Sequence, residues 1–289
     1  MKKQIIILFT GLTLLSSCYD AMNEVPLERM PPEIAFKDSL KVEMFVNELY
    51  VGLNTGIGGY NSFGGGAANQ NSFFDCVTDL GVLSPRGTNT AINSFTGATF
   101  HSGSGGNTDS RWAQVYQYMR KTNVVLEYIH YCEQLSQAKM AQYVGEAKLH
   151  KALLHYEMLK RYGGITIMDD LFAGGNIELP RNTFDECVEY IVRLCEEAAG
   201  GLPLRYPDND YGRLTKGAAL GLKAKVLLYA ASPLFNENPI AGTTEIQRYA
   251  SPDDRRWERA AKAALDVINL RMPNGAPAYE LFPDRKSVV

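Results

Sequence analysis

A succession of amphipathic helices from residue 111 onward constrains the fold of this chain more than any other feature. Apolar side chains recur three or four residues apart, which places them on one helical face. A similar stripe of apolar residues marks a helix over residues 39–53. The expected helices after it span residues 111–129, 136–161, 183–202, 215–231 and 251–271.

Signals at the helix ends support these boundaries. Gly163 and Gly164 end the second of the five helices, and Thr183 with Glu186 forms a capping box at the start of the third. Ser251 is expected as the N-cap of the fifth, with Pro252 in its first turn. The face expected to pack consists of Trp257, Ala260, Ala261, Ala264 and Ile268.

Helices of this length, joined by modest loops and carrying small residues on their packing faces, favour stacked antiparallel pairs. Alanine at a contact lets two helix axes approach closely. The fold class expected is all-α, with tetratricopeptide-like stacked helix pairs. A long Gly-, Asn- and aromatic-rich region between residues 56 and 110 interrupts the helices, and a loop of that length in a compact domain is functional or disordered.

The amino terminus has the pattern of a lipoprotein signal. Lys2 and Lys3 precede an apolar run over residues 5–15, and the sequence Leu-Ser-Ser-Cys ends at Cys18. The run is shorter than the roughly 20 residues that span a bilayer. We therefore expect a signal peptide over residues 1–17 and lipidation of Cys18; an ordinary secretory signal with a chance cysteine is the alternative.

Charge and cysteine content exclude several other functions. The net charge is −3 and there is no basic run, which argues against a nucleic-acid partner. Cys76, Cys132, Cys187 and Cys195 form no CxxC pair, so buried free thiols are favoured over a disulfide framework or a metal site. The four histidines lack ligand spacing. We expect no metal and no cofactor.

Five motifs in order resemble the SusD/RagB family of outer-membrane nutrient-binding lipoproteins. The residues that carry the resemblance are 112–116 with Asn123; 145–148 with Ala152 and 161–165; 181–183 with Leu202 and Pro203; 212–219 with 223–226, 228–230 and 232–235; and Trp257 with Ala260, Ala261 and Ala264. Each motif alone is weak. Their shared order behind a lipid-attachment signal makes the resemblance specific.

The resemblance implies a lead-in over residues 18–38 and a SusD-like helical domain over residues 39–289. Within that domain, residues 39–235 correspond to the amino-terminal region and residues 236–289 to the start of the carboxy-terminal region. Family members are usually longer, so the chain resembles the amino-terminal portion of a member, as a truncated gene would encode. The resemblance also implies lipid-anchored display at the cell outer membrane and a SusC-like TonB-dependent transporter as partner.

Ligand-binding residues are expected in the long loop region, by their position relative to the family. The candidates are Asp79, Arg86, Asn93, Phe95 and Phe100. A sugar ring offers C–H patches that stack on aromatic faces, and its hydroxyl groups bond to carboxylate, amide and guanidinium groups. Loop packing is the competing role for the same residues. Packing is also the role favoured for Trp112, and ion pairs or helix capping for Arg213, Lys216 and Lys223.

The function that these observations predict is capture of an oligosaccharide, or of another nutrient such as a peptide, and its delivery to the transporter without catalysis. Two alternatives remain from other classes. A secreted α-helical glycan-active enzyme would place two carboxylates about 5–10 Å apart in a cleft. A helical-repeat scaffold for protein partners would instead show a concave surface without an aromatic-lined pocket.

Overall fold

The computed structural model describes residues 30–56, 79, 112–171, 178–237 and 241–281. Within these ranges the regular structure is helical and no strand occurs, which confirms the all-α expectation. The main helices are α3 (Ser39–Gly56), α5 (Trp112–Tyr128), α6 (Gln137–Tyr162), α7 (Phe184–Gly201), α8 (Lys216–Ala231) and α10 (Arg255–Ile268). The short elements are α2 (Pro32–Ala35), η3 (Ile129–Tyr131), η4 (Asp208–Asp210) and α9 (Pro233–Asn236).

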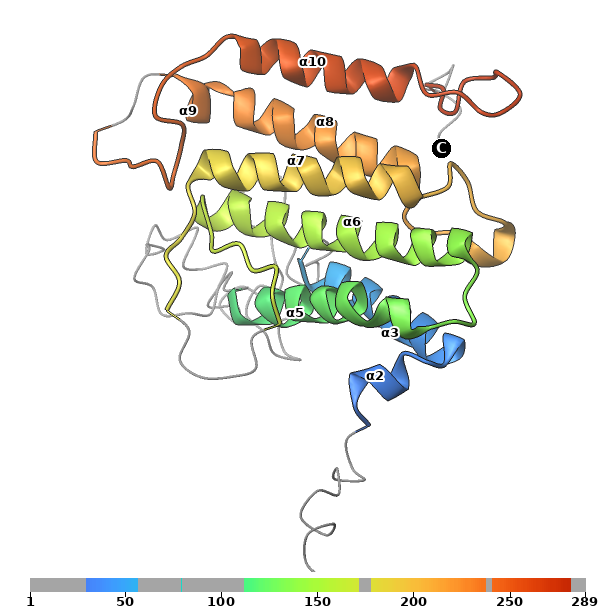
Figure 1. The fold of residues 1–289 in the computed structure, drawn as a ribbon. Helices are drawn as coiled ribbons and strands as arrows, with labels where there is room; N and C mark the ends of the chain where they lie inside the picture. The colour runs from blue at the N-terminus through green and yellow to red at the C-terminus, as the bar shows by residue number, and fades with distance from the viewer. Residues whose placement is uncertain (1–29, 57–78, 80–111, 172–177, 238–240, 282–289) are drawn as a thin grey trace, which may run out of the picture.

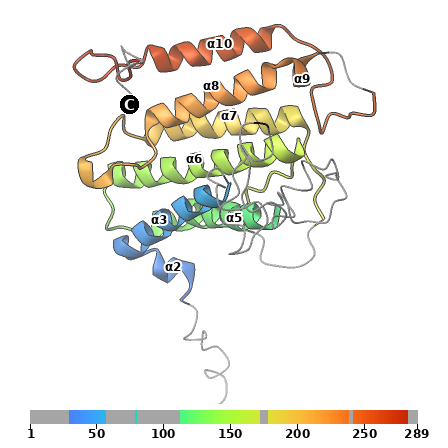
Figure 2. The same cartoon turned by 180° about the vertical axis from the view of Figure 1, so that it is seen from behind.

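The helices form a stack in which neighbours in sequence are neighbours in space. Figure 1 shows α6, α7, α8 and α10 as successive layers, with α5 and α3 beside the free face of α6, and Figure 2 shows the same order from behind. Each helix contacts mainly the one before and the one after it, as in a helical-repeat stack. None of the described helices is both long and apolar enough to cross a bilayer.

Local sequence signals set most helix ends. The Ser136 side chain accepts a hydrogen bond from the Lys139 amide and caps α6. Thr183 and Glu186 form the expected capping box at α7, and the Thr215 hydroxyl caps α8. Gly163 ends α6 at φ 71°, a left-handed conformation that glycine adopts without steric cost.

Two apolar clusters hold the stack together. The larger one joins α6, α7, α8 and α10 around side chains such as Leu159, Phe184 and Val226. The smaller one joins α3, α5 and the first half of α6 around Phe36 and Tyr143. Because α6 contributes to both clusters, it is the helix on which the other elements assemble.

The expected start of α10 is wrong. The helix begins at Arg255 with Asp254 as its N-cap residue, three positions after Pro252. The amide of Asp253 donates to Asn236 Oδ1 at 2.9 Å, and Asn236 Nδ2 donates to the Asp253 carbonyl at 2.9 Å. These two bonds fasten the segment before the helix to α9, so residues 251–253 do not enter the helix.

The expected packing face of α10 is also largely wrong. Ala260 and Ala263 are the buried residues, whereas Ala261, Ala264, Trp257 (44% exposed) and Ile268 (63% exposed) face outward. Ala260 belongs to both faces. Three residues correspond to about 300° of rotation in a helix, so Ala263 lies about 60° beyond Ala260, on the side away from Trp257. The outermost layer therefore packs through alanines and leaves its larger apolar side chains exposed.

Candidate functional site

The sequence-predicted ligand residues fall almost entirely outside the described residues. Asp79 is described and is exposed. Arg86, Asn93, Phe95 and Phe100 lie outside the described residues, as does Cys18. Their assignment as ligand and lipid-attachment residues therefore stays a prediction.

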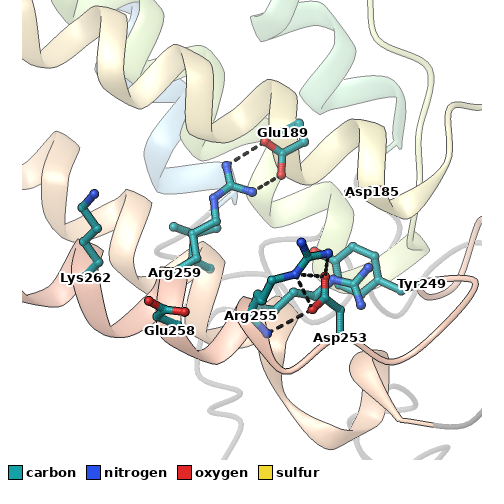
Figure 3. A pocket seen from close by; sticks show the side chains of 10 residues that line it. Asp185, Glu189, Tyr249, Asp253, Arg255, Glu258, Arg259 and Lys262 are labelled. Carbon is teal, nitrogen blue, oxygen red and sulfur yellow. Dashed lines mark hydrogen bonds and ion pairs between the residues drawn. The ribbon is translucent and has the colours of Figure 1, made fainter.

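A charged cavity of about 500 Å³ lies where the start of α7 meets the start of α10 (Figure 3). Sequence reasoning did not find it. The residues that line it are Asp185, Glu189, Leu227, Tyr249, Asp253, Arg255, Arg256, Glu258, Arg259 and Lys262. The signal for it was the acidic first turn of α7 and the arginine-rich first turns of α10, which only the fold brings together.

Two arginine–carboxylate pairs line this cavity. Arg259 donates to both oxygens of Glu189 across the α7–α10 contact, with Nη2 2.7 Å from Oε2. Arg255 donates to both oxygens of Asp253 at 2.9–3.2 Å. Bidentate pairs fix side-chain geometry. Glu189 and Asp253 therefore serve as hydrogen-bond acceptors in fixed positions.

The aromatic ring at the cavity is covered. The Arg256 guanidinium lies 3.5 Å from the centre of the Tyr249 ring and donates to the Ser251 carbonyl at 2.8 Å. Tyr249 is only 5% exposed. A sugar cannot stack on this ring without displacing the arginine, so the cavity offers polar contacts and no free aromatic face.

Asp185 is a carboxyl group in the cavity whose pKa is raised, whereas the hydrogen bonds from Arg255 lower the pKa of Asp253. Burial, followed by the charge of Glu189 one turn away, raises the pKa of Asp185. Of the other cavity carboxylates, Glu189 is occupied by Arg259 and Asp253 by Arg255, whereas Glu258 forms no described ion pair. Among the described residues, no group of three or more His, Cys, Asp or Glu side chains is placed to hold a metal ion. The cavity is thus suited to hydrogen bonding.

A second polar cluster, also missed from sequence, surrounds Glu146. This carboxylate is fully buried on α6 and accepts from Arg213 Nη1 at 2.9 Å, from Gln142 at 2.7 Å and from the Tyr50 hydroxyl at 3.0 Å. Burial of Tyr50, together with the Glu146 charge, raises the pKa of that phenol beyond its usual range. The cluster ties α3, α6 and the turn before α8 together.

The structure places the family-matching residues mainly in packing roles. Tyr116 donates to the Thr166 carbonyl at 2.8 Å, and buried Asn123 donates to the Met168 carbonyl at 3.0 Å. Trp112 packs against Tyr116 and Tyr162. Arg213 and Lys223 form ion pairs, as expected: Arg213 with Glu146, and Lys223 with Glu196 at 2.9 Å.

The comparison with protein families identifies this scaffold. Residues 27–228 match the SusD-like family described as starch-binding and associating with the outer membrane. The chain belongs to the SusD-like family. The family is described by binding rather than by a reaction, in agreement with the expectation of a non-catalytic protein.

Individual SusD-like proteins share both sequence and fold with the chain. It is 23% identical over 235 residues to SusD-like protein P25 of Formosa agariphila, a match that covers 78% of this chain and 43% of that protein. The crystal structure of a SusD-like protein from Bacteroides fragilis aligns with a TM-score of 0.55 at 25% identity, over 89% of this chain and 42% of that one. The chain thus spans about two fifths of these relatives.

A third relative was solved with a sugar bound. Surface glycan-binding protein A from Bacteroides thetaiotaomicron, in complex with laminarihexaose, aligns with a TM-score of 0.56 at 18% identity. The alignment covers 86% of this chain and 45% of that protein. At this identity the likeness shows a shared fold, and the glycan is a property of that relative.

Proposed function

We propose that this SusD-like chain is a non-catalytic, cell-surface lipoprotein that captures an oligosaccharide and delivers it to a SusC-like TonB-dependent transporter. The match of residues 27–228 to a starch-binding, outer-membrane-associated family carries the proposal. The laminarihexaose complex of a relative with the same fold supports a glycan as ligand.

The membrane attachment in this proposal rests on the signal at the amino terminus. Acyl chains on Cys18 would hold the protein at the outer membrane, since each buried methylene contributes about 0.8 kcal/mol. Attachment through lipid also agrees with the described residues, none of whose helices could span a bilayer.

Glycan binding by residues 19–289 tests the capture step. A polysaccharide array followed by titration calorimetry should identify a ligand, and Asp79→Ala or Arg86→Ala should lower the affinity about tenfold or more. Hydrogen bonds to charged groups contribute about 1.5–3 kcal/mol, which corresponds to a loss of that size. A sample that melts cooperatively but binds no glycan would overturn the proposal.

Two variants separate the long loop from the charged cavity as the place of binding. Glu258 and Lys262 line the cavity and form none of its described ion pairs, so Glu258→Ala and Lys262→Ala should leave the fold intact. We expect both variants to bind glycan as the wild type does. Weaker binding in these variants, with Asp79→Ala unaffected, would move the ligand to the charged cavity.

Labelling with a palmitate analogue in a bacterial host tests the anchor. The wild-type protein should be labelled and found in the outer-membrane fraction, and Cys18→Ser should be unlabelled and released. Cys76→Ser is the matched control and should keep the label. Co-purification of the wild-type protein with a SusC-like transporter from the same membranes tests the delivery step.

A further inference from the structure

A third feature shares no lining residue with the charged cavity. The turn between η4 and α8 carries Tyr211, whose side chain is 92% exposed. Beside it is a cavity of about 380 Å³, open to solvent. The residues that line this cavity are Asn47, Tyr50, Asn209, Asp210, Tyr211, Gly212 and Arg213.

The turn that presents Tyr211 is anchored through the residues that follow it. Arg213, two residues on, donates to Asp210 at 3.0 Å, to Asn47 at 2.8 Å and to the buried Glu146 at 2.9 Å. The Leu214 amide donates to the Tyr50 hydroxyl at 2.9 Å. The backbone that carries the Tyr211 ring is therefore held in position before any ligand arrives, which limits the entropy lost on binding.

The polar groups around the ring retain unused hydrogen-bonding capacity. Asn47 accepts from Arg213 through Oδ1 and keeps its amide N–H groups. Asp210 accepts from Arg213 through Oδ1 and keeps Oδ2. In the part of the chain that the structure describes, the Asn209 side chain has no hydrogen-bond partner. The Asn47 amide N–H groups, the Asp210 Oδ2 oxygen and the whole side-chain amide of Asn209 therefore remain able to bond to a ligand in the cavity.

An exposed aromatic face beside amide and carboxylate groups matches the chemistry of a saccharide. The C–H face of a pyranose stacks on an aromatic ring, and its hydroxyl groups both donate and accept hydrogen bonds. The cavity volume lies within the range of about 300–1,000 Å³ typical of small-ligand sites. The charged cavity differs because Arg256 covers its ring.

We propose that Tyr211, with Asn47, Asn209 and Asp210, forms a second saccharide subsite, built from residues that do not belong to the long loop region. One sugar ring stacks on Tyr211 while its hydroxyl groups bond to the two amides and the carboxylate. The inference rests on the proposed function in one respect, namely that the ligand is a glycan. It adds a contact point that the family match does not assign.

Binding to the Asp79→Ala/Arg86→Ala double variant isolates this subsite. Titration calorimetry and saturation-transfer NMR use the glycan that the array identifies. The double variant should retain weak binding, and Tyr211→Ala in the same background should weaken it a further ~3- to 10-fold, the loss that removal of an aromatic contact causes. Tyr211→Phe should bind like its parent, because the stacking face remains.

Trp257→Ala is the matched control. It removes an exposed ring from α10 and should leave binding unchanged. If the wild-type protein binds glycan and Tyr211→Ala binds as tightly as its parent, the subsite is overturned and the proposed function stands. Absence of residual binding in the double variant would also overturn the subsite. A folded wild-type protein that binds no glycan would overturn both.

Discussion

Arg213 donates a hydrogen bond to Glu146 across 2.9 Å, and the carboxylate it reaches has no solvent-exposed surface. The two residues are 67 positions apart in the sequence. A buried charge without a partner is costly. The Glu146 carboxylate on α6 therefore needs Arg213, and the pair fixes the turn before α8 to α6.

Loss of this pair should destabilise the fold strongly. Arg213→Ala leaves the Glu146 carboxylate buried without its cation, and we expect the free energy of unfolding to fall by about 3–5 kcal/mol. Urea denaturation measures the change. The exposed pair of Lys121 with Glu48, 2.7 Å apart, provides the control: Lys121→Ala should cost less than about 1 kcal/mol. Equal losses in the two variants would contradict the prediction.

Stability should fall as the solution is acidified. Burial lowers the pKa of His150 to about 3 and that of His155 to about 4, from an ordinary value of 6.5. The unfolded chain therefore binds more protons between about pH 4 and 6.5, and the free energy of unfolding decreases as the pH falls through that range.

His150→Phe should reduce that pH dependence. The Tyr50 and His150 ring centres are 4.3 Å apart in an edge-on arrangement, which a phenyl ring at position 150 can keep. The substitution also removes a buried imidazole whose two nitrogens have no hydrogen-bond partner. Urea midpoints from pH 4 to 7 should show a slope smaller by up to about 1.4 kcal/mol per pH unit. An unchanged slope would show that His150 is not the group responsible.

Two adjacent glycines at the end of α7 should respond oppositely to alanine. A Cβ on Gly201 would lie 2.3 Å from the Ala141 carbonyl oxygen of α6, whereas a Cβ on Gly200 would meet nothing within 4 Å. Gly201→Ala should lower the free energy of unfolding by about 1–3 kcal/mol through overpacking. Gly200→Ala should raise it by up to about 1 kcal/mol, because alanine favours the helix. Thermal melts of both variants measure these changes, and shifts in the same direction would contradict the prediction.

Three cysteines should resist a thiol reagent in the folded chain. Cys132, Cys187 and Cys195 are free and buried, and burial raises the pKa of Cys195 to about 12. The thiolate is the reactive form. At pH 8, mass mapping should find their peptides unlabelled in the native protein and labelled in denaturant. Rapid labelling without denaturant would show that the stack opens.

Short-range signals in the sequence predicted the helices well. Ser136, Thr183 and Thr215 cap the helices that follow them, because a cap requires only a side-chain oxygen and an amide three residues on. The beginning of α10 could not be predicted in the same way. It is set by the hydrogen bonds between Asp253 and Asn236, which form only once α9 and the start of α10 are together.

The candidate sites depended on contacts that the sequence does not display. The sequence 208–213 reads as a polar turn, and nothing in it shows that Arg213 reaches Glu146 or that the Tyr211 ring stands free. The charged cavity likewise needs Glu189 and Arg259, 70 positions apart, to meet across two helices. Ion pairing or helix capping is the role that the sequence favours for Arg213, and its partner Glu146 is set by the fold.

The anchoring of the Tyr211 turn has a consequence for how the molecule opens. Arg213 binds α3 through Asn47 and α6 through Glu146, so opening the turn requires these bonds to both helices to break. Its backbone amides should then exchange with deuterium as part of the α3–α6 unit, far more slowly than those of an ordinary surface turn. A segment whose Tyr211 side chain is 92% exposed should therefore open together with the helices that hold it.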